Sequence, residues 1–323
     1  MILVGTSGWS YDDWVGPVYP KPMAGKPEAW LSEYARRFPT VEVNSTFYRL
    51  PPPATVRAWI DKARALGGDF EYSAKVPQDV THRAMVAGDD LAMADGVEAF
   101  HREVAKPLSE RGLFGAALLQ LAPRFAHGER ETRSLSRCLG LLAARGIPAA
   151  VEFRNPTWVT AHVRSKSPSA AASGSASRAP PGSALDAPAG EDVLLAGEAR
   201  DALREHGAAL AAVDGCPWFP RVVDATGPHA YFRFHGRNPG AWETGSEEAE
   251  GGRHARYDYV YGPAELAPLA DEIRAASRKV RATRAYFNNH PGGKAVRNAL
   301  ETMGLLGETT PHRRAGQSGL AEF

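Results

Sequence analysis

The sequence predicts an α/β protein with a single (β/α)8 barrel of the TIM type, in which some helices are irregular or missing. Three observations predict this fold. Eight short apolar runs, each closed by polar residues with Gly or Pro, have the pattern of buried strands. Segments with helical periodicity lie between most of these runs. The chain has 323 residues, which one such barrel with an insertion accounts for.

The expected strands are short, and each stops where polar residues begin. The first starts near Ile2 and ends at Gly5, just before "GWSYDDW", a loop rich in glycine and tryptophan. The eighth is expected to end near Asn289. The runs that carry the eight strands occupy residues 2–5, 40–48, 69–77, 115–123, 148–156, 208–215, 229–237 and 284–293.

Helical periodicity separates most of these strands. In the first helical segment, Trp30, Tyr34 and Phe38 recur at a spacing of four and therefore share one face. The helical segments cover residues 27–38, 53–66, 132–146, 197–207, 262–280 and 293–307. Strands that alternate with helices indicate βαβ units and a parallel sheet, and eight such units favour a closed barrel over an open sheet.

The barrel domain is expected to cover residues 1–307, followed by a frayed tail at 308–323. One segment does not fit the pattern. Residues 165–192 are rich in Ser, Ala, Pro and Gly, contain no aromatic residue, and have almost no large apolar side chain. Such a segment cannot bury enough surface to offset its ordering entropy. We therefore expect a disordered insertion after the fifth strand.

The composition excludes several classes of protein. The net charge is +1, so nothing global indicates binding to nucleic acid or to a membrane surface. Two distant cysteines, Cys138 and Cys216, are too few for a disulfide framework and indicate a reducing compartment. No stretch has the ~18 apolar residues of a membrane span, and the first residues do not form a secretory signal. We expect a cytoplasmic protein without a membrane partner.

Polar residues gather at the carboxyl ends of the expected strands, where the sites of parallel barrels lie. The loop after the first strand adds Trp9, either as a stacking surface or as a core residue that plugs the barrel mouth. The remaining candidates are Glu42, Asn44, Lys75, His82, Gln120, Glu152, Arg154, Asp214, Arg233, His235, Asn288 and Asn289. Ionisable groups within sheet-like runs are costly unless they are paired or used in function. The structural alternative is a ladder of buried ion pairs.

Strand alternation sorts these candidates into a hypothesis. Residues two apart share a face, and inward residues of alternate barrel strands lie in one layer. Lys75, Arg154, Arg233 and His235 are therefore expected to converge and to hold a phosphate, sulfate or carboxylate. The expected catalytic set is Glu152, as the preferred general base, with Glu42, Asp214 and His235.

Three hypotheses for the function follow. The leading one is a hydrolase-like enzyme for a small anionic or phosphate-bearing substrate, with a phosphodiester in nucleic acid as one case. The second is a glycoside-type hydrolase, in which two carboxyl groups ~5–10 Å apart have no cation between them. Its sugar-stacking residues would be Trp9, Trp14, Trp158 and Trp242. The third is a non-catalytic module for single-stranded nucleic acid, which the near-zero net charge counts against.

No cofactor is predicted. The sequence has no phosphate-binding loop, no dinucleotide fingerprint and no H-E-x-x-H motif. The spacing of its carboxylates and histidines does not indicate a divalent metal site.

Several motifs resemble a known family. They are "GTSGWSYDDWVGPVYP", "FPTVEVNSTFYRLP", "YSAKVPQDVTH", "LLQLAPRF", "VEFRNPTW", "YFRFHGRN" and "YFNNHPGGKAVRNAL". In this order they resemble the domain-of-unknown-function family number seventy-two, the YecE-like family. The resemblance implies a TIM barrel without an established activity. Trp9, Trp158 and the twelve other strand-end candidates fall on matching positions. The chain departs from the family pattern at 165–192 and at 243–262.

Overall fold

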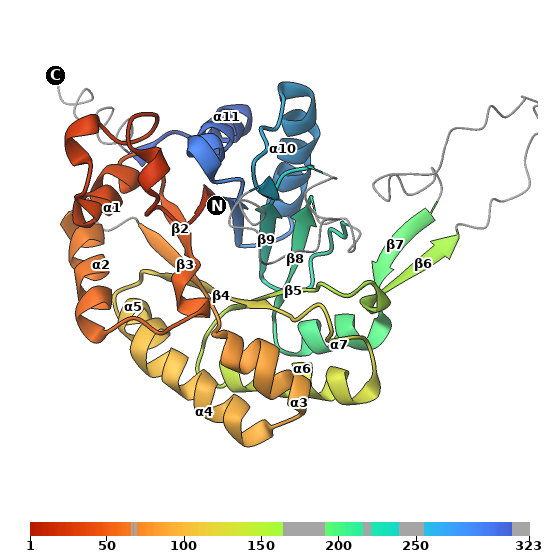
Figure 1. Cartoon of the computed structure of the whole chain (residues 1–323). Coiled ribbons are helices and arrows are strands. Elements are labelled where there is room, and N and C mark those ends of the chain that lie inside the picture. The colour runs from red at the N-terminus through yellow and green to blue at the C-terminus, as the bar shows by residue number, and fades with distance from the viewer. Residues whose placement is uncertain (66, 68–69, 164–190, 216–220, 239–254, 312–323) are drawn as a thin grey trace, which may run out of the picture.

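The computed structural model describes residues 1–65, 67, 70–163, 191–215, 221–238 and 255–311. Within them, eight parallel strands close into a barrel in the order β1-β10-β9-β8-β5-β4-β3-β2 (Figure 1). This architecture confirms the expected TIM-type fold. The barrel strands are β1 (Ile2–Ser7), β2 (Thr40–Val43), β3 (Glu71–Lys75), β4 (Phe114–Gln120), β5 (Ala149–Glu152), β8 (Ala209–Asp214), β9 (His229–Phe234) and β10 (Ala282–Phe287).

Two strand ends differ from the expectation. β1 continues to Ser7, because Ser7 still pairs in register with Glu42 of β2. Gly5 therefore does not end the strand. A Cβ at Gly5 would lie 2.2 Å from the carbonyl oxygen of Thr40, so the glycine permits close packing of the two strands. β10 stops at Phe287, two residues before the expected end.

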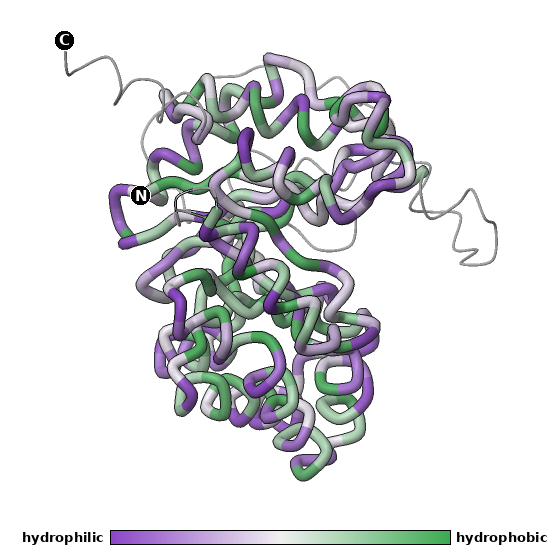
Figure 2. Tube along the Cα trace, turned by 90° about the vertical axis from the view of Figure 1, so that its left-hand side faces the viewer, coloured by the Kyte–Doolittle hydropathy of each residue, from purple (hydrophilic) through white to green (hydrophobic). Residues whose placement is uncertain are grey.

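All six expected helices are present. They are α1 (Pro27–Ala35), α2 (Pro53–Ala65), α6 (Glu129–Ala143), α7 (Gly197–Glu205), α10 (Pro263–Ser277) and α11 (Lys294–Leu306). They surround the strands (Figure 1), and hydrophobic and hydrophilic residues alternate along them (Figure 2). Short 3₁₀ turns in the loops are η1 (Asp12–Trp14), η2 (Lys21–Met23), η3 (Ser45–Phe47), η6 (Pro156–Trp158) and η7 (Pro291–Gly293).

The connection from β3 to β4 is helical, which the sequence analysis did not predict. Its elements are a π-helical turn η4 (Asp79–Ala84), α3 (Met85–Ala87), α4 (Asp90–Phe100), a second π-helical turn η5 (His101–Ala105) and α5 (Lys106–Ser109). Gly96 interrupts the apolar pattern of α4. A Cβ there would lie 2.5 Å from the Val80 side chain, so this glycine lets α4 pack closely on η4.

Between β8 and β9, the described residues 221–228 contain no helix, in agreement with the expected irregular helices. An antiparallel hairpin of β6 (Val159–Val163) and β7 (Glu191–Leu195) extends from the barrel (Figure 1). The expected insertion lies outside the described residues, apart from 191–192, which begin β7. The expected tail is described only as far as residue 311. None of the helices in the described ranges is long and apolar enough to cross a membrane.

The barrel interior is a packed core with a polar layer above it. The apolar layer consists of buried Ala116, Leu118, Ala150, Ala209, Ala211, Tyr231 and Tyr286. Below it, Arg284 Nε donates to Glu71 Oε1 at 2.6 Å. Above it, toward the carboxyl ends of the strands, the inward side chains become charged. This change in polarity locates the candidate site.

Candidate active site at the carboxyl ends of the strands

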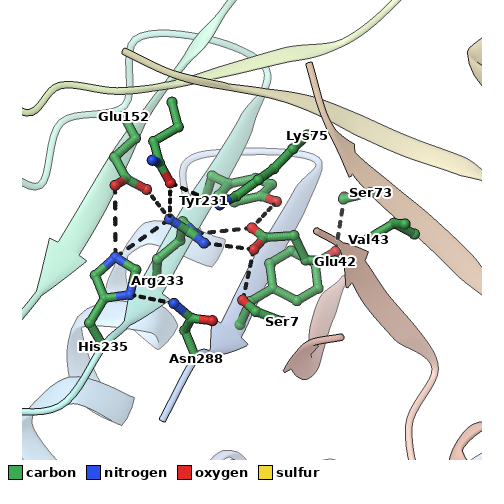
Figure 3. Close-up of polar contacts among 12 residues, drawn as sticks. Ser7, Glu42, Val43, Ser73, Lys75, Glu152, Tyr231, Arg233, His235 and Asn288 are labelled. Carbon is green, nitrogen blue, oxygen red and sulfur yellow. Dashed lines mark hydrogen bonds and ion pairs between the residues drawn. The ribbon is translucent and has the colours of Figure 1, made fainter. Parts of the chain in front are cut away.

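A buried guanidinium lies at the centre of the polar layer. Arg233 of β9 has no exposed surface and donates to both oxygens of Glu42, from Nη2 at 2.8 Å and from Nε at 3.0 Å (Figure 3). Its Nη1 donates to Glu152 Oε2. One cation therefore lies between two carboxylates that come from β2 and β5.

Both carboxylates have further partners. Ser7 Oγ donates to Glu42 at 2.7 Å, and Tyr231 Oη donates to the other Glu42 oxygen at 2.7 Å. Arg154 Nε donates to Glu152 Oε1 at 2.6 Å. A buried charge is tolerated where ion pairs and hydrogen bonds satisfy it, and this condition is met here. We call Glu42, Glu152, Arg154 and Arg233 the ion-pair cluster.

The ion-pair cluster keeps its carboxylates ionised. Burial alone would raise the pKa of Glu42, but the charges of Arg233 and Lys75 outweigh burial and lower it. Burial would likewise raise the pKa of Glu152, and Arg154 and Arg233 together hold that pKa well below its usual range. A carboxylate with a low pKa is a weak base. The electrostatics therefore disfavour Glu152 as a general base.

His235 lies beside this cluster in its neutral form. It is fully buried, and burial, followed by the charge of Arg233, lowers its pKa to about 4. Its Nδ1 is 2.9 Å from Asn288 Nδ2, and its Nε2 is 3.8 Å from Glu152 Oε1 (Figure 3). A neutral imidazole adds no positive charge near pH 7, so His235 does not act as the fourth cation of an anion site.

Lys75 differs from the two arginines. It lies at the end of β3, where its Nζ donates to the neutral Gln120 Oε1 at 2.9 Å. Among the described residues it forms no ion pair with a carboxylate. Burial, followed by the charge of Arg233, lowers its pKa to about 7, although Glu42 and Glu152 act in the opposite direction. Near pH 7 the neutral amine is therefore a substantial fraction of this side chain.

A pocket of about 520 Å³ lies at the barrel mouth, and Lys75 forms part of its wall. Aromatic rings line much of it. Trp9 and Trp59 meet edge to face with centroids 5.7 Å apart, and Tyr11 stacks on His290 at 4.5 Å. The lining residues are Gly8, Trp9, Ser10, Tyr11, Val43, Asn44, Ser45, Tyr48, Thr55, Trp59, Lys75, Tyr257, Asn288 and His290.

Two features of the pocket lining are unusual. The Oδ1 of Asn44 is buried and accepts no hydrogen bond from the described residues. An unpaired buried acceptor is costly, and a ligand donor in the pocket would satisfy it. At the rim, Tyr48 leaves 74% of its surface exposed, which is unusual for a large aromatic side chain.

The structure brings most of the predicted residues together. Glu42, Lys75, Glu152, Arg154, Arg233 and His235 converge as expected, with Gln120 and Asn288 bonded to members of this group. Trp9 and Asn44 line the pocket. His82 lies in η4 beside Phe47, with ring centroids 5.0 Å apart, and burial lowers its pKa to about 4.

Two predicted residues face away from the site. Asp214 of β8 bonds to Arg237 at 2.8 Å, Arg221 at 2.9 Å and Tyr261 at 2.8 Å. Ala209 and Ala211 face the barrel interior, so alternation directs Asp214 outward. The expected convergence of Asp214 with Glu42 and Glu152 is therefore wrong.

Asn289 is the second of these. Its Nδ2 donates to the backbone of Tyr259 and to Asn298 of α11, each at 2.9 Å. It follows the inward-facing Tyr286 and Asn288 by an odd number of residues, so it too lies on the outer face.

The predicted tryptophans divide in a similar way. Trp14 and Trp158 are fully buried in the outer core, and Trp242 lies outside the described residues. The sequence analysis missed Trp59, because its position on α2 has the pattern of a core helix face. It also missed Tyr48, Tyr257 and His290 as pocket residues. Tyr257 lies in 243–262, where the chain departs from the family pattern.

No group of three or more His, Cys, Asp or Glu residues is arranged to hold a metal ion within the described part of the chain. The carboxylates of the ion-pair cluster are already bonded to arginines, which compete with any cation for the same oxygens.

Comparison with known proteins identifies related chains. A family model described as "Protein of unknown function DUF72" matches residues 3–170 and 194–319. The chain is 26% identical over 312 residues to the UPF0759 protein YunF of Bacillus subtilis, covering 95% of each. It is 33% identical over 158 residues to the UPF0759 protein YecE of Escherichia coli, covering 49% of this chain and 50% of YecE.

Solved structures agree with this result. The crystal structure of a DUF72 family protein from Thermotoga maritima matches with a TM-score of 0.71 and 31% identity, covering 95% of this chain and all of that one. A DUF72 family protein from Enterococcus faecalis matches with a TM-score of 0.71 at 23% identity, covering 96% of each chain, and supports the fold alone.

Proposed function

We propose that this chain, which belongs to the DUF72 family, is an enzyme for a small organic molecule that carries one anionic group. The substrate binds in the pocket at the barrel mouth, and Lys75 meets its carboxylate or phosphate group. The observation that carries this proposal is the position of the Lys75 amine. Lys75 lines the pocket, and its amine forms no ion pair with the described residues, whereas both arginines beside it are paired.

The charges around the pocket support a single anionic group. Two carboxylates and two guanidinium groups of the ion-pair cluster cancel, and His235 is neutral. The proton on Lys75 then leaves one positive charge in excess. The expected four-cation site is revised accordingly, because protein carboxylates already satisfy Arg154 and Arg233. A bound anion would favour the protonated amine and raise its pKa.

The size and lining of the pocket fit a metabolite-sized molecule. Small-molecule pockets commonly enclose ~300–1,000 Å³ and combine apolar walls with a few polar groups. Here Trp9 and Trp59 supply apolar surface, while Asn44 supplies an unpaired acceptor.

The glycoside-hydrolase hypothesis loses its main support. It requires paired carboxyl groups with no cation between them. Arg233 bonds to both Glu42 and Glu152, so this condition fails. The hypothesis of a nucleic-acid-binding module is also weaker, because Trp14 and Trp158 are in the core and offer no stacking platform.

Thermal stability with matched ligands tests the proposal. We expect millimolar lactate, glycerol phosphate or inorganic phosphate to raise the melting temperature by about 2 °C or more, and neutral glycerol to have no effect. The shift should weaken as the pH rises above 7, because Lys75 then loses its charge. It should disappear in Lys75→Met and persist in Lys106→Met, a matched change at an exposed lysine. Equal shifts in both variants would refute an anion site at Lys75.

A further inference from the structure

The surroundings of Lys75 keep its amine apart from acidic groups. The nearest carboxylates, Glu42 and Glu152, are each bonded to Arg233. The amine instead bonds to the side-chain carbonyl of Gln120. A neutral acceptor orients an N–H group without strongly favouring the charged form.

The charged groups near the amine raise or lower the pKa of Lys75. Arg233 on β9 and Arg154 on β5 disfavour the ammonium form, in addition to burial, and Glu42 and Glu152 oppose them. His82 in η4 is neutral near pH 7, because burial and nearby cations lower its pKa to about 4. The balance leaves a substantial fraction of Lys75 with a lone pair on nitrogen. Lysines that are desolvated beside another cation are activated as nucleophiles.

The amine also has access to a reaction space. Lys75 lines the pocket with Asn44, Asn288 and the aromatic walls, so a molecule held there lies next to this side chain. On the other side, the Nζ is 5.3 Å from the ring centroid of Phe47, which restricts the directions of approach. The hydrogen bond to Gln120 therefore orients the Lys75 amine, and the side chain that carries this amine borders the pocket.

We propose that Lys75 is a carbonyl-reactive lysine, which forms an imine with an aldehyde or ketone group of a small anionic substrate. This inference rests on the proposed function and gives its substrate class. The nitrogen lone pair attacks the carbonyl carbon and forms a C–N bond, while the C=O π electrons move to oxygen. A proton passes from nitrogen to that oxygen and gives a carbinolamine.

The second half of the step expels water. The hydroxyl group takes one proton from the solvent in the pocket and leaves, and the nitrogen lone pair forms the C=N bond. Starting from the ammonium form, the balance is one lysine ammonium and one carbonyl compound to one protonated imine and one water. No oxidant, reductant or metal takes part. The attacking species is the neutral amine in equilibrium with the anion-paired ammonium, and the protonated imine restores the positive charge beside the anionic group of the substrate.

Reductive trapping tests this step. The protein is incubated at pH 7 with pyruvate or glyoxylate and sodium cyanoborohydride, which reduces an imine to a stable secondary amine. Peptide mass spectrometry then locates the adduct. The neutral fraction of Lys75 at pH 7 is about a thousandfold larger than that of an exposed lysine. We expect Lys75 to be labelled at least tenfold faster than Lys106, which is exposed. Equal labelling of the two lysines would overturn the proposal.

An isosteric variant adds a readout that a structural role would not change. Gln120→Glu places a carboxylate at the oxygen that now accepts from Lys75, which raises the pKa of the lysine. The midpoint of labelling against pH should move upward from about 7 by at least one unit, with labelling recovered at higher pH. An unchanged midpoint would overturn the proposal.

The outcomes separate this inference from the proposed function. Lactate and glycerol phosphate contain no carbonyl that can form an imine, so their stabilising effect reports anion binding alone. If they stabilise the protein while pyruvate and glyoxylate leave no adduct on Lys75, the anion site stands and the reactive lysine is refuted. Lys75→Arg keeps a positive charge without a reactive amine. It is therefore expected to retain some anion stabilisation and to lose all trapping at this position.

Discussion

Replacing Lys75 by methionine should make the folded protein more stable near neutral pH. The lysine pays a folding cost because burial and Arg233 disfavour its ammonium form, which the unfolded chain solvates freely. Methionine has a similar length and no charge to desolvate. The same change should abolish anion-dependent stabilisation, so the gain in stability accompanies a loss of function.

The magnitude follows from the pKa. A fall from 10.5 to about 7 corresponds to roughly 5 kcal/mol at ~1.4 kcal/mol for each pKa unit. Lys75 is only half-buried because its side chain opens to the pocket, so water relieves part of this cost. Halving the figure and subtracting about 1 kcal/mol for the lost hydrogen bond to Gln120 leaves a gain of about 1–2 kcal/mol.

The pH dependence has a definite sign. Below pH 7 both the folded and unfolded states carry the proton, so the full cost is present. Between pH 7 and 10.5 the unfolded state binds more protons, and wild-type stability rises relative to the variant as the pH increases. The advantage of Lys75→Met should therefore be largest near pH 6 and shrink by pH 9.

Urea unfolding of wild type, Lys75→Met and Lys106→Met at pH 6 and pH 9 measures this difference. The exposed Lys106 controls for the loss of one positive charge. If Lys75→Met is less stable than wild type at pH 6, or if its advantage grows toward pH 9, Lys75 is an ordinary charged lysine. Both the electrostatic argument and the reactive-amine proposal would then lose their basis.

Three other outcomes are expected. Arg233→Met should cost about 3–5 kcal/mol in urea unfolding, because it leaves the buried Glu42 without an ion-pair partner among the described residues and leaves Glu152 with Arg154 alone; a loss below 1 kcal/mol would contradict the ion-pair cluster. The ring of His235 should titrate in NMR with a midpoint below pH 5. Because the unfolded state binds this proton more readily, the free energy of unfolding should decrease as the pH falls from 6.5 toward 4. A midpoint above 6 would contradict its burial beside a cation. Gly215→Ala should cost at least about 2 kcal/mol, because φ is +89° and a Cβ would lie 2.1 Å from the Gly236 carbonyl oxygen; a near-neutral change would show that this loop relaxes.

The sequence predicted the barrel because its signals are local. Apolar runs, helical periodicity and glycine stops each depend on a few neighbouring residues, and the order of strands follows from their alternation with helices. The expectation that residues two apart share one face also held for Arg233 of β9 and for His235, which directly follows the strand.

The same reasoning failed where the apolar pattern does not distinguish the two faces of a strand. In β8, "ALAAVD" is apolar on both faces, so nothing in the sequence distinguishes inward from outward positions. Asp214 was assigned to the site on its type and strand-end location alone. Its partner Arg237 follows β9 and its partner Arg221 lies in the β8–β9 loop, and contacts of this kind depend on tertiary geometry. Trp59 was missed for a related reason, since helix periodicity places it on a buried face without showing that this face borders a pocket.

The charge balance at the mouth could not be obtained from residue types either, and it decides what the site can do. The sequence supplies four basic side chains and two glutamates, which suits an anion site or an ion-pair ladder equally well. The geometry divides these side chains into two groups. Arg154 and Arg233 pair with the two carboxylates, and the amide of Gln120 lies beside the Lys75 amine. A carboxylate at that position would have produced a third buried ion pair and an unreactive ammonium. A neutral amide leaves the amine hydrogen-bonded, oriented and only partly protonated. The buried ion pairs and the reactive lysine are therefore parts of one arrangement, in which Arg233 both occupies the carboxylates and disfavours the charge on its neighbour.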